Sequence, residues 1–457
     1  MSISEAAAAP AAVDLPLSLQ QEFLRLFDRG DAEGPFGPRY IVADGWRVGG
    51  EVDLAALRQA LDDVAARHES LRTTIVRGEE GSGQRVSPPS AVSLTVRDLP
   101  GVDPADRGRV AEELVNEIEA QTYSIRQSPL LWAVLGRFDR TDSVLVLVTH
   151  HTAADAWSMQ VVMRDVASCY AARVQGREPG LEPAAQYGEY AVAQLEQLGA
   201  PSVQRAREYW RKTLDGARIL TVPADKARGA EEEAITGWYR FLAGAELRTG
   251  TARLAESTHS SPFMVLLAAF NVLASRQTGS QDIVVPTFTP GRGQARFQKT
   301  VGSFFNFVPL RTDLTGCATF RDVVARTRAT CLGAYSHEVP LLVVLQEAPE
   351  LMASLAAPGV APALFQVIQP PFVMEREQIG GLEFSAIWRR VITQEIGSDI
   401  PDGVLWSLHL GPTEEIVGAI GYSAHLFTTQ TLDRSTAEYV SLLGSLLASP
   451  DAPLAGL

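Results

Sequence analysis

The chain has 457 residues, of which 46% are hydrophobic and 21% are charged, shares that are typical of a globular protein. Its 40 basic and 54 acidic side chains give a net charge of -14, which argues against nonspecific nucleic-acid binding because phosphate neutralisation needs a basic face. A single domain usually holds about 100–200 residues, so we expect two domains of similar size.

The sequence also bears on the cellular compartment. No run of about 18 uncharged apolar residues occurs, so no membrane span is expected. The opening MSISEAAAAPAAVD lacks the basic start and long apolar stretch of a signal peptide and is interpreted as a frayed tail. The three cysteines, Cys169, Cys317 and Cys331, are widely spaced and odd in number, which favours free thiols and a cytoplasmic location.

The first half contains three clear predicted elements. Residues 54–68 repeat apolar side chains at helical spacing, with Leu54, Leu57, Leu61 and Val64 on one stripe. The run SVLVLVT at 143–149 is short, β-branched and apolar on both faces, which predicts a central strand. Helical periodicity returns from Trp157 to Val174.

The segment QGREPGLEP at 175–183 carries two glycines and two prolines and is the best candidate linker. We therefore expect an N-terminal domain of residues 1–178 and a C-terminal domain of residues 179–457. Beyond the linker, YAVAQLEQL and AREYWRKTL predict amphipathic helices, and residues 262–274 predict a buried helix. DIVVPTF predicts a buried strand that leads into the turn PGRG at 290–293.

The most informative segment follows the strand at 143–149 and reads HHTAADAWS, from His150 to Ser158. A neutral imidazole at a strand end can accept the proton of an attacking alcohol or amine during acyl transfer, because its ordinary pKa is about 6.5. The nearby Asp155 carboxylate either relays charge to the histidine or points away and braces the loop. The His pair also fits half of a metal site, but no further Cys, His or carboxylate ligand follows at short spacing, so no metal is expected.

Several segments together resemble the condensation domains of nonribosomal peptide synthetases, within the chloramphenicol-acetyltransferase-like superfamily. LPLSLQQEFL at 15–24 and RHESLRT at 67–73 are similar to the first two family motifs, and HHTAADAWS is similar to the HHxxxDG signature. QYGEYAVAQ, EYWRKTLDG, TPGRG, VGSFFNFVPLR, SHEVP, ALFQVIQ and GYSAHLFTTQTL resemble later family segments. The motifs keep the family order over nearly the whole chain, and this joint match is specific.

The resemblance implies an α/β (α+β) fold of two acetyltransferase-like subdomains, arranged as a V-shaped pseudodimer with a central tunnel. The donor would be an acyl thioester on the phosphopantetheine arm of an acyl or peptidyl carrier protein, and no bound cofactor is expected. The acceptor would be a small molecule with a hydroxyl or amine, ester formation being favoured. Because no adenylation or carrier segment is apparent in these 457 residues, we expect a free-standing enzyme that meets its carrier protein in trans, as in ester-forming tailoring steps of enediyne-type natural products.

By position, the resemblance assigns catalysis to His151 and an architectural role to His150. Asp155 matches the aspartate that turns away from the histidine, and Arg292 matches its arginine partner. Ala156, Trp157, Ser158 and Asn306 match positions near the tunnel or the acceptor. Whether His151 acts as a base or mainly positions the acceptor is left open.

Departures from the family pattern concern a few positions. Ala156 stands where the family has glycine, so either a positive φ strains it or a first-turn position lets its methyl group narrow the donor channel. Phe307, Val308 and His425 are also unusual at their positions and either tune the acceptor pocket or are neutral.

Two other function classes stay open: a CoA-dependent O-acyltransferase and a non-catalytic module that recruits other proteins. Heterocyclisation relatives carry Asp in place of His150, and epimerisation relatives place Trp after the serine, so neither branch fits. Plant-type CoA acyltransferases have a DFGWG loop that this chain lacks.

Overall fold

A computed structural model describes residues 13–78, 81–227, 234–369 and 372–454. The chain forms two compact units, and both mix helices with sheets, which confirms the expected α/β fold. Unit 1 contains residues 1–196, 292–304 and 374–386, and unit 2 contains residues 197–291, 305–373 and 387–457. The V-shaped arrangement and its central tunnel stay predictions. The residues interpreted as a frayed tail lie almost entirely outside the described ranges.

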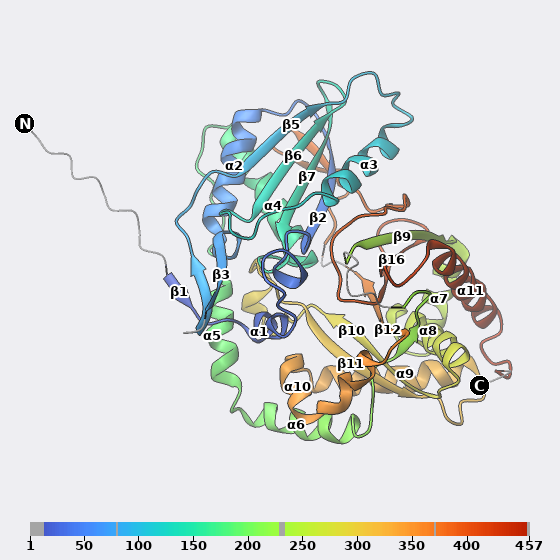
Figure 1. The fold of residues 1–457 in the computed structure, drawn as a ribbon. Helices are drawn as coiled ribbons and strands as arrows, with labels where there is room; N and C mark the ends of the chain where they lie inside the picture. The colour runs from blue at the N-terminus through green and yellow to red at the C-terminus, as the bar shows by residue number, and fades with distance from the viewer. Residues whose placement is uncertain (1–12, 79–80, 228–233, 370–371, 455–457) are drawn as a thin grey trace, which may run out of the picture. The chain divides into compact units, whose positions relative to one another are not determined.

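Unit 1 is built on a six-stranded sheet in the order β13-β14-β2-β7-β6-β5 (Figure 1). Its strands are β2 (Ile41–Gly49), β5 (Ser93–Asp98), β6 (Leu131–Arg137), β7 (Asp142–His150), β13 (Glu377–Ile379) and β14 (Leu382–Ala386). A smaller sheet contains β1 (Val13–Leu15), β4 (Gly81–Val86) and β3 (Thr73–Gly78). The helices of this unit are α1 (Leu19–Arg25), α2 (Leu54–Arg67), α3 (Arg107–Glu119), α4 (Ala156–Val174) and most of α5 (Tyr187–Gln197).

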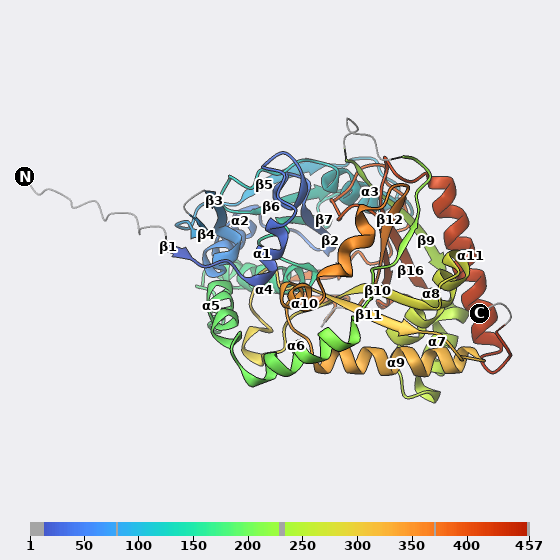
Figure 2. The same cartoon turned by 60° about the horizontal axis from the view of Figure 1, so that its bottom comes forward.

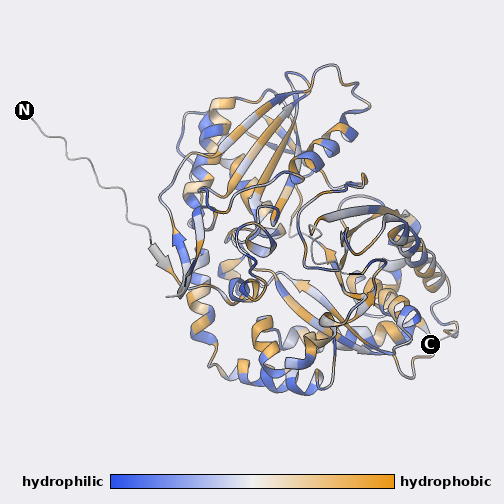
Figure 3. Cartoon of the chain, in the orientation of Figure 1, coloured by the Kyte–Doolittle hydropathy of each residue, from blue (hydrophilic) through white to orange (hydrophobic). Residues whose placement is uncertain are grey.

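The central strand β7 is buried from Ser143 to His150, as its continuous apolar run predicts. Helices cover both of its faces. On one face the Thr149 hydroxyl contacts the Met159 sulfur of α4 at 3.3 Å, and on the other α3 lies against β7. Figure 3 shows the strands of this sheet as largely hydrophobic. The predicted helices over 54–68 and 157–174 are confirmed as α2 and α4.

Unit 2 has a five-stranded sheet in the order β8-β12-β15-β16-β9 and a two-stranded ribbon, β10-β11. The strands are β8 (Thr221–Pro223), β9 (Thr236–Ala243), β10 (Asp282–Thr289), β11 (Asn306–Asp313), β12 (Val360–Ile368), β15 (Val404–His409) and β16 (Ile416–Ser423). The helices are α6 (Pro201–Thr213), α7 (Ala245–Ser257), α8 (Pro262–Thr278), α9 (Phe320–Ser336), α10 (Leu341–Glu347) and α11 (Thr429–Ala448). Helix α9 lies against β11 (Figure 2), and α8 is buried from Met264 to Ser275 as predicted. None of the helices in the described ranges is both long and apolar enough to cross a membrane.

The division into units differs from the single boundary expected after residue 178. Two later segments return to unit 1: the loop 292–304 and the hairpin of β13 and β14, whose strand β14 pairs with β2. The linker at 175–183 does lie between α4 and α5. Sheet pairing between distant segments, rather than the composition of the linker, decides which residues belong together.

The returning loop packs tightly on α5, at a position that requires glycine. A Cβ atom on Gly302 would lie 2.0 Å from Cδ2 of Tyr187, and the Tyr187 ring is buried with its hydroxyl hydrogen-bonded to the Ser303 carbonyl at 2.7 Å. No rotation of the added methyl group can relieve this overlap, so the loop and α5 would have to separate.

We therefore expect Gly302→Ala to lower the free energy of unfolding by about 1–3 kcal/mol, the usual cost of overpacking. Gly293→Ala is the matched control in the same loop, because a Cβ there meets no atom within 4 Å. Urea denaturation of both variants checks the prediction, and equal stabilities would contradict it.

Candidate functional site

The candidate site is the loop between β7 and α4 in unit 1, which carries the two histidines and Asp155. Strand β7 ends at His150, and α4 begins at Ala156 with Asp155 as its N-cap. Aspartate is a favoured N-cap because its side chain accepts a hydrogen bond from a free backbone N–H group in the first turn. Here Oδ1 of Asp155 accepts from the Ser158 amide at 2.7 Å. The loop is therefore fixed at both ends by regular secondary structure.

His150 is fully buried and hydrogen-bonded at both ring nitrogens. Nε2 lies 3.0 Å from the Gly37 carbonyl, to which it donates, and Nδ1 lies 2.8 Å from the Thr152 hydroxyl. Burial lowers the pKa of His150 to about 4, so the ring is neutral at pH 7. Since both nitrogens are used by the protein, neither is left to bind a metal ion.

His151 is half-buried and held by segments on either side of it. Its Nδ1 lies 3.0 Å from the Ala154 carbonyl, a hydrogen bond that it can make only as the donor. Its ring stacks on Tyr40 at a centroid distance of 4.9 Å and an interplanar angle of 21°, and its backbone N–H donates to the Tyr40 carbonyl at 2.8 Å. Burial lowers the pKa of His151, while the nearby Asp155 charge opposes this shift in part. In the neutral ring that results, the proton is on Nδ1 and Nε2 carries the basic lone pair.

Asp155 and Arg292 form a buried ion pair within unit 1. Nη2 of Arg292 lies 3.1 Å from Oδ1 of Asp155, and only 2% of the arginine side chain and 7% of the aspartate side chain are exposed. The Phe304 amide donates to Oδ2 of Asp155 at 3.1 Å. The carboxylate thus accepts hydrogen bonds from α4 and from both ends of the loop 292–304. Of the two roles that the sequence left open for Asp155, charge relay and bracing of the loop, these contacts correspond to bracing.

Nη1 and the guanidinium plane of Arg292 make further contacts in unit 1. Nη1 donates to the carbonyls of Phe297 and Thr300 at 2.8 and 2.7 Å, and the guanidinium lies 3.9 Å from the centroid of the Phe304 ring. A buried cation needs such compensation because removing it from water costs several kcal/mol. Arg292 therefore ties residues 297–304 into one folded loop.

Ser158 and Trp157, in the first turn of α4, attach the helix to the same loop. The Ser158 hydroxyl donates to the Gly302 carbonyl at 2.8 Å and accepts from Nη2 of Arg292 at 2.7 Å. Nε1 of Trp157 donates to the Gln298 carbonyl at 3.0 Å. Both residues, expected near the tunnel or acceptor, are seen to connect α4 to the returning loop.

Ala156 is the first residue of α4, and its side chain is exposed. Across the described ranges, the non-glycine residues with positive φ are His259 and Arg376, so Ala156 has no left-handed strain. The structure thereby excludes the strained alternative and places the methyl group at a tolerated first-turn position. The effect of this methyl group on a donor channel stays a prediction.

Asn306 belongs to unit 2, where it holds the start of α10. Its Nδ2 donates to the Val339 carbonyl at 2.9 Å, and its Oδ1 accepts from the Leu341 amide at 3.1 Å. Phe307 and Val308 are buried core residues of the same unit, and Nε2 of His425 lies 3.9 Å from Oδ1 of Asp402. The structure thus links Asp155, Trp157, Ser158 and Arg292 through the loop 292–304. It holds His150 and His151 beside them through Gly37, Tyr40, Thr152 and Ala154, and it fixes Asn306 through separate contacts.

Three contacts of the site were not apparent in the sequence. Gly37 and Tyr40 hold the two histidines, and Phe304 supports both Arg292 and Asp155. The signal for Tyr40 was indirect: it precedes β2, whose first residue, Ile41, pairs with His150. Finding it required knowing which strand lies beside β7.

Comparison with known proteins shows the family to which the chain belongs. Residues 35–457 match the family described as Condensation domain, so the chain belongs to the condensation domain family. It is 32% identical over 447 residues to chondramide synthase cmdD of Chondromyces crocatus and 29% identical over 449 residues to phosphinothricin tripeptide synthetase PhsC of Streptomyces viridochromogenes. The matches cover 97% of this chain but only 11% and 40% of those proteins.

Solved structures support the same assignment. SgcC5 from Streptomyces globisporus is 47% identical, with a TM-score of 0.93, and the match covers 96% of this chain and 100% of that one. The X-domain from teicoplanin biosynthesis is 25% identical, with a TM-score of 0.79 and 98% coverage of both chains. Condensation domains generally join acyl groups to acceptors through amide or ester bonds, but some relatives, including X-domains, are not catalytic.

The buried pair yields a first prediction for this site. In Asp155→Asn the neutral amide leaves Arg292 as a buried charge without its counterion, which costs about 3–5 kcal/mol. We expect a poorly soluble or inactive protein, measured as soluble yield and unfolding midpoint. A well-folded Asp155→Asn variant with full activity would show that the pair is not required as a brace.

His150 yields a second prediction, on stability against pH. Its folded pKa of about 4 lies below the ordinary value of 6.5, so between these values the unfolded chain binds a proton that the folded chain does not. The contribution of His150 to the free energy of unfolding is therefore fully present above pH 6.5. It is lost as the pH falls towards 4, and the total loss is roughly 3 kcal/mol.

Urea unfolding at a series of pH values measures this effect. His409, whose pKa burial lowers to about 3, titrates in the same direction, so the difference between the parent and His150→Gln isolates His150. We expect a shallower loss of stability in the variant between pH 6.5 and pH 4. Parallel curves would contradict the assignment.

Proposed function

We propose that this protein is a condensation enzyme that transfers an acyl or aminoacyl group from the phosphopantetheine thioester of a carrier protein to a small-molecule hydroxyl, forming an ester. The observation that carries the proposal is the fixed, neutral His151 ring, whose Nδ1 donates to the Ala154 carbonyl. That tautomer makes Nε2 the nitrogen that can accept a proton. An amine acceptor, forming an amide, is the related alternative.

The chemistry follows from this tautomer. Nε2 of His151 takes the proton of the acceptor hydroxyl as its oxygen attacks the thioester carbonyl carbon. The tetrahedral intermediate collapses, the carbon–sulfur bond breaks, and the departing phosphopantetheine thiolate receives the proton from His151. The products are an ester and a free thiol. A neutral amine needs less help from a base, so for that acceptor positioning would supply more of the rate.

Similarity to SgcC5 supports a diol acceptor. The match covers all of the SgcC5 chain, and the solved SgcC5 structure is a complex with (R)-(-)-1-(2-naphthyl)-1,2-ethanediol and sucrose. An aryl vicinal diol presents two hydroxyl nucleophiles and no amine. By analogy, we infer a vicinal diol as the acceptor and a carrier protein that acts in trans.

A non-catalytic recruiting role is the second candidate, because an X-domain that is 26% identical has been solved in complex with OxyB. Its support is the likeness to that X-domain. Against it, a module that only recruits a partner has no need for an imidazole with a fixed tautomer at this loop.

We expect His151→Ala to abolish ester formation while the protein stays folded, because the Asp155–Arg292 pair is untouched. The assay offers 1-(2-naphthyl)-1,2-ethanediol with one aminoacyl group loaded on a carrier protein or on coenzyme A, and detects the ester by mass spectrometry. His259→Asn is the matched control, since His259 is exposed with φ of 50° and asparagine tolerates that conformation.

The two acyl donors in this assay distinguish the candidate functions. Transfer from the carrier protein alone supports the proposal, transfer from coenzyme A as well supports a CoA-dependent O-acyltransferase, and no transfer from either donor supports the recruiting module. Near-normal turnover by His151→Ala would rule out a base at this position.

A further inference from the structure

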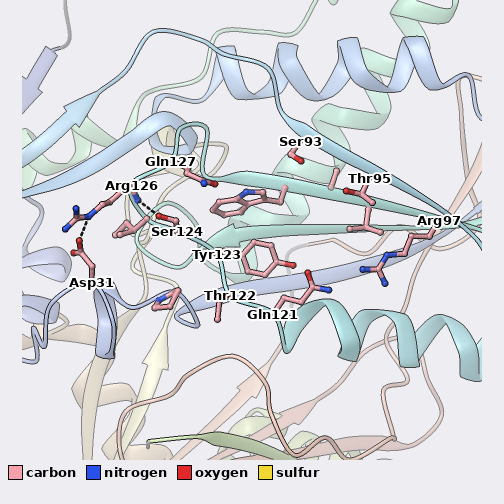
Figure 4. A pocket seen from close by; sticks show the side chains of 15 residues that line it. Asp31, Ser93, Thr95, Arg97, Gln121, Thr122, Tyr123, Ser124, Arg126 and Gln127 are labelled. Atoms are coloured by element: carbon pink, nitrogen blue, oxygen red, sulfur yellow. Dashed lines mark hydrogen bonds and ion pairs between the residues drawn. The ribbon is translucent and has the colours of Figure 1, made fainter.

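A cavity of about 580 Å³ lies within unit 1, at the edge of the six-stranded sheet (Figure 4). Its volume falls in the range of small-molecule sites, about 300–1,000 Å³. The side chains that matter for its chemistry come from β5, β6 and the segment after α3: Ser93, Thr95, Arg97, Gln121, Tyr123 and Trp132. All of them lie before residue 197, so one compact unit builds the cavity.

The strand register places the cavity beside the histidine loop. Ser93 pairs with Trp132 in β6, and Trp132 pairs with Val148 in β7, two residues before His150. Alternate residues of a strand share a face, so His150 lies on the same face of β7 as Val148. The cavity and His150 therefore lie at the same end of neighbouring strands.

The cavity also shares a wall with this loop. Pro38 lines the cavity, and its carbonyl accepts from the Tyr123 amide at 2.7 Å. The residue before Pro38 is Gly37, whose carbonyl accepts from His150, and two residues after it Tyr40 stacks on His151. The segment 37–40 thus contacts the cavity through Pro38 and the two histidines through Gly37 and Tyr40.

The charged side chains of the lining are paired within the protein. Arg97 donates to Glu117 at 2.6 Å, and Arg126 forms an ion pair with Asp31, drawn as a dashed line in Figure 4. Each of these cations has a carboxylate beside it, so the lining offers little uncompensated positive charge to an anionic ligand. The lining instead favours a neutral ligand.

The uncharged polar groups of the lining are hydroxyls and amides, which both donate and accept hydrogen bonds. Ser93, Thr95, Gln121 and Gln127 supply them from β5 and from the segment that follows α3. Both strand residues and both glutamines are exposed, so a ligand would replace water at these groups. Such groups match a ligand that itself carries several hydroxyls.

An aromatic surface completes the lining. The half-buried Trp132 indole lies 4.9 Å from the Tyr123 ring, centroid to centroid, and the Tyr123 hydroxyl donates inward to the Ile118 carbonyl at 2.9 Å. Tyr123 is thereby fixed and supports Trp132 from the side. A rigid indole surrounded by hydroxyls and amides suits a ring with one apolar C–H face and a polar edge.

We propose that this cavity binds a neutral polyhydroxylated ring, such as a hexose. The ring is either a free sugar or a glycosyl group carried by the acceptor. In the second case the sugar docks beside the segment 37–40, which also contacts His151 through Tyr40, and helps to position the acceptor, and that part of the inference rests on the proposed function.

The first test is direct binding to the whole protein. Methyl hexopyranosides serve as probes at millimolar concentrations, followed by saturation-transfer difference NMR, and need neither a carrier protein nor turnover. We expect binding by the parent that weakens at least about tenfold in Trp132→Leu, which removes the aromatic face, and in Thr95→Trp, which fills the cavity.

Gln204→Ala is the matched control, because Gln204 is exposed in unit 2 and should leave binding unchanged. Circular dichroism establishes that each variant is folded, and Gln121→Ala replaces Trp132→Leu if that variant is not. No binding of any methyl hexopyranoside, or equal binding by the parent and both cavity variants, would overturn the proposal.

The second test separates the two sources of the sugar. The KM for a glycosylated diol is compared with the KM for the same diol without its sugar, in the parent and in Thr95→Trp. A change in this ratio assigns the cavity to the glycosyl group of the acceptor, whereas an unchanged ratio with probe binding intact in the parent assigns it to a free sugar. If acyl transfer fails but the probes bind, the proposed function is wrong and the cavity assignment stands.

Discussion

The buried ion pair between Asp155 and Arg292 is the interaction on which the geometry of the site depends. Asp155 caps α4, and Arg292 begins the loop 292–304 that returns to unit 1 after the chain has built part of unit 2. The pair is stable in its buried position because each charge is also hydrogen-bonded, Asp155 by backbone amides and Arg292 by backbone carbonyls. Without those bonds the desolvation of two charges would exceed their attraction.

His151 and Asp155 are only four positions apart in the sequence, but different contacts hold them. Asp155 makes its hydrogen bonds to α4 and to the returning loop, while His151 is held by Ala154 and Tyr40. Asp155 acts on His151 through its charge, which partly offsets the effect of burial on the pKa of the ring. The carboxylate is therefore held by contacts that do not include the imidazole.

The local pattern of apolar residues was sufficient to predict the helices and the strand around the site. The same pattern could not predict which strands pair in the sheets. The apolar run 143–149 and the periodicity of 54–68 and 157–174 produced β7, α2 and α4, because burial of one stripe or one strand is a local property. Family resemblance supplied the pairing of Asp155 with Arg292. Membership of 292–304 and 374–386 in unit 1 depends on contacts between distant segments, such as β14 with β2, and a single boundary after residue 178 could not represent it.

The same dependence on pairing explains why the cavity near Trp132 was not anticipated. LWAVLGR, the sequence of β6, indicates a strand, and nothing in it distinguishes Trp132 from a core residue. Its role follows from β5 being the edge strand, so that the residues beyond α3 cover the end of the sheet only partly and leave Trp132 half-buried. Because β6 lines the cavity and pairs directly with β7, a ligand held there lies on the strand next to the one that ends at His150, and Pro38 of the segment 37–40 contacts it. An acceptor long enough to span that distance would be positioned at both of its ends.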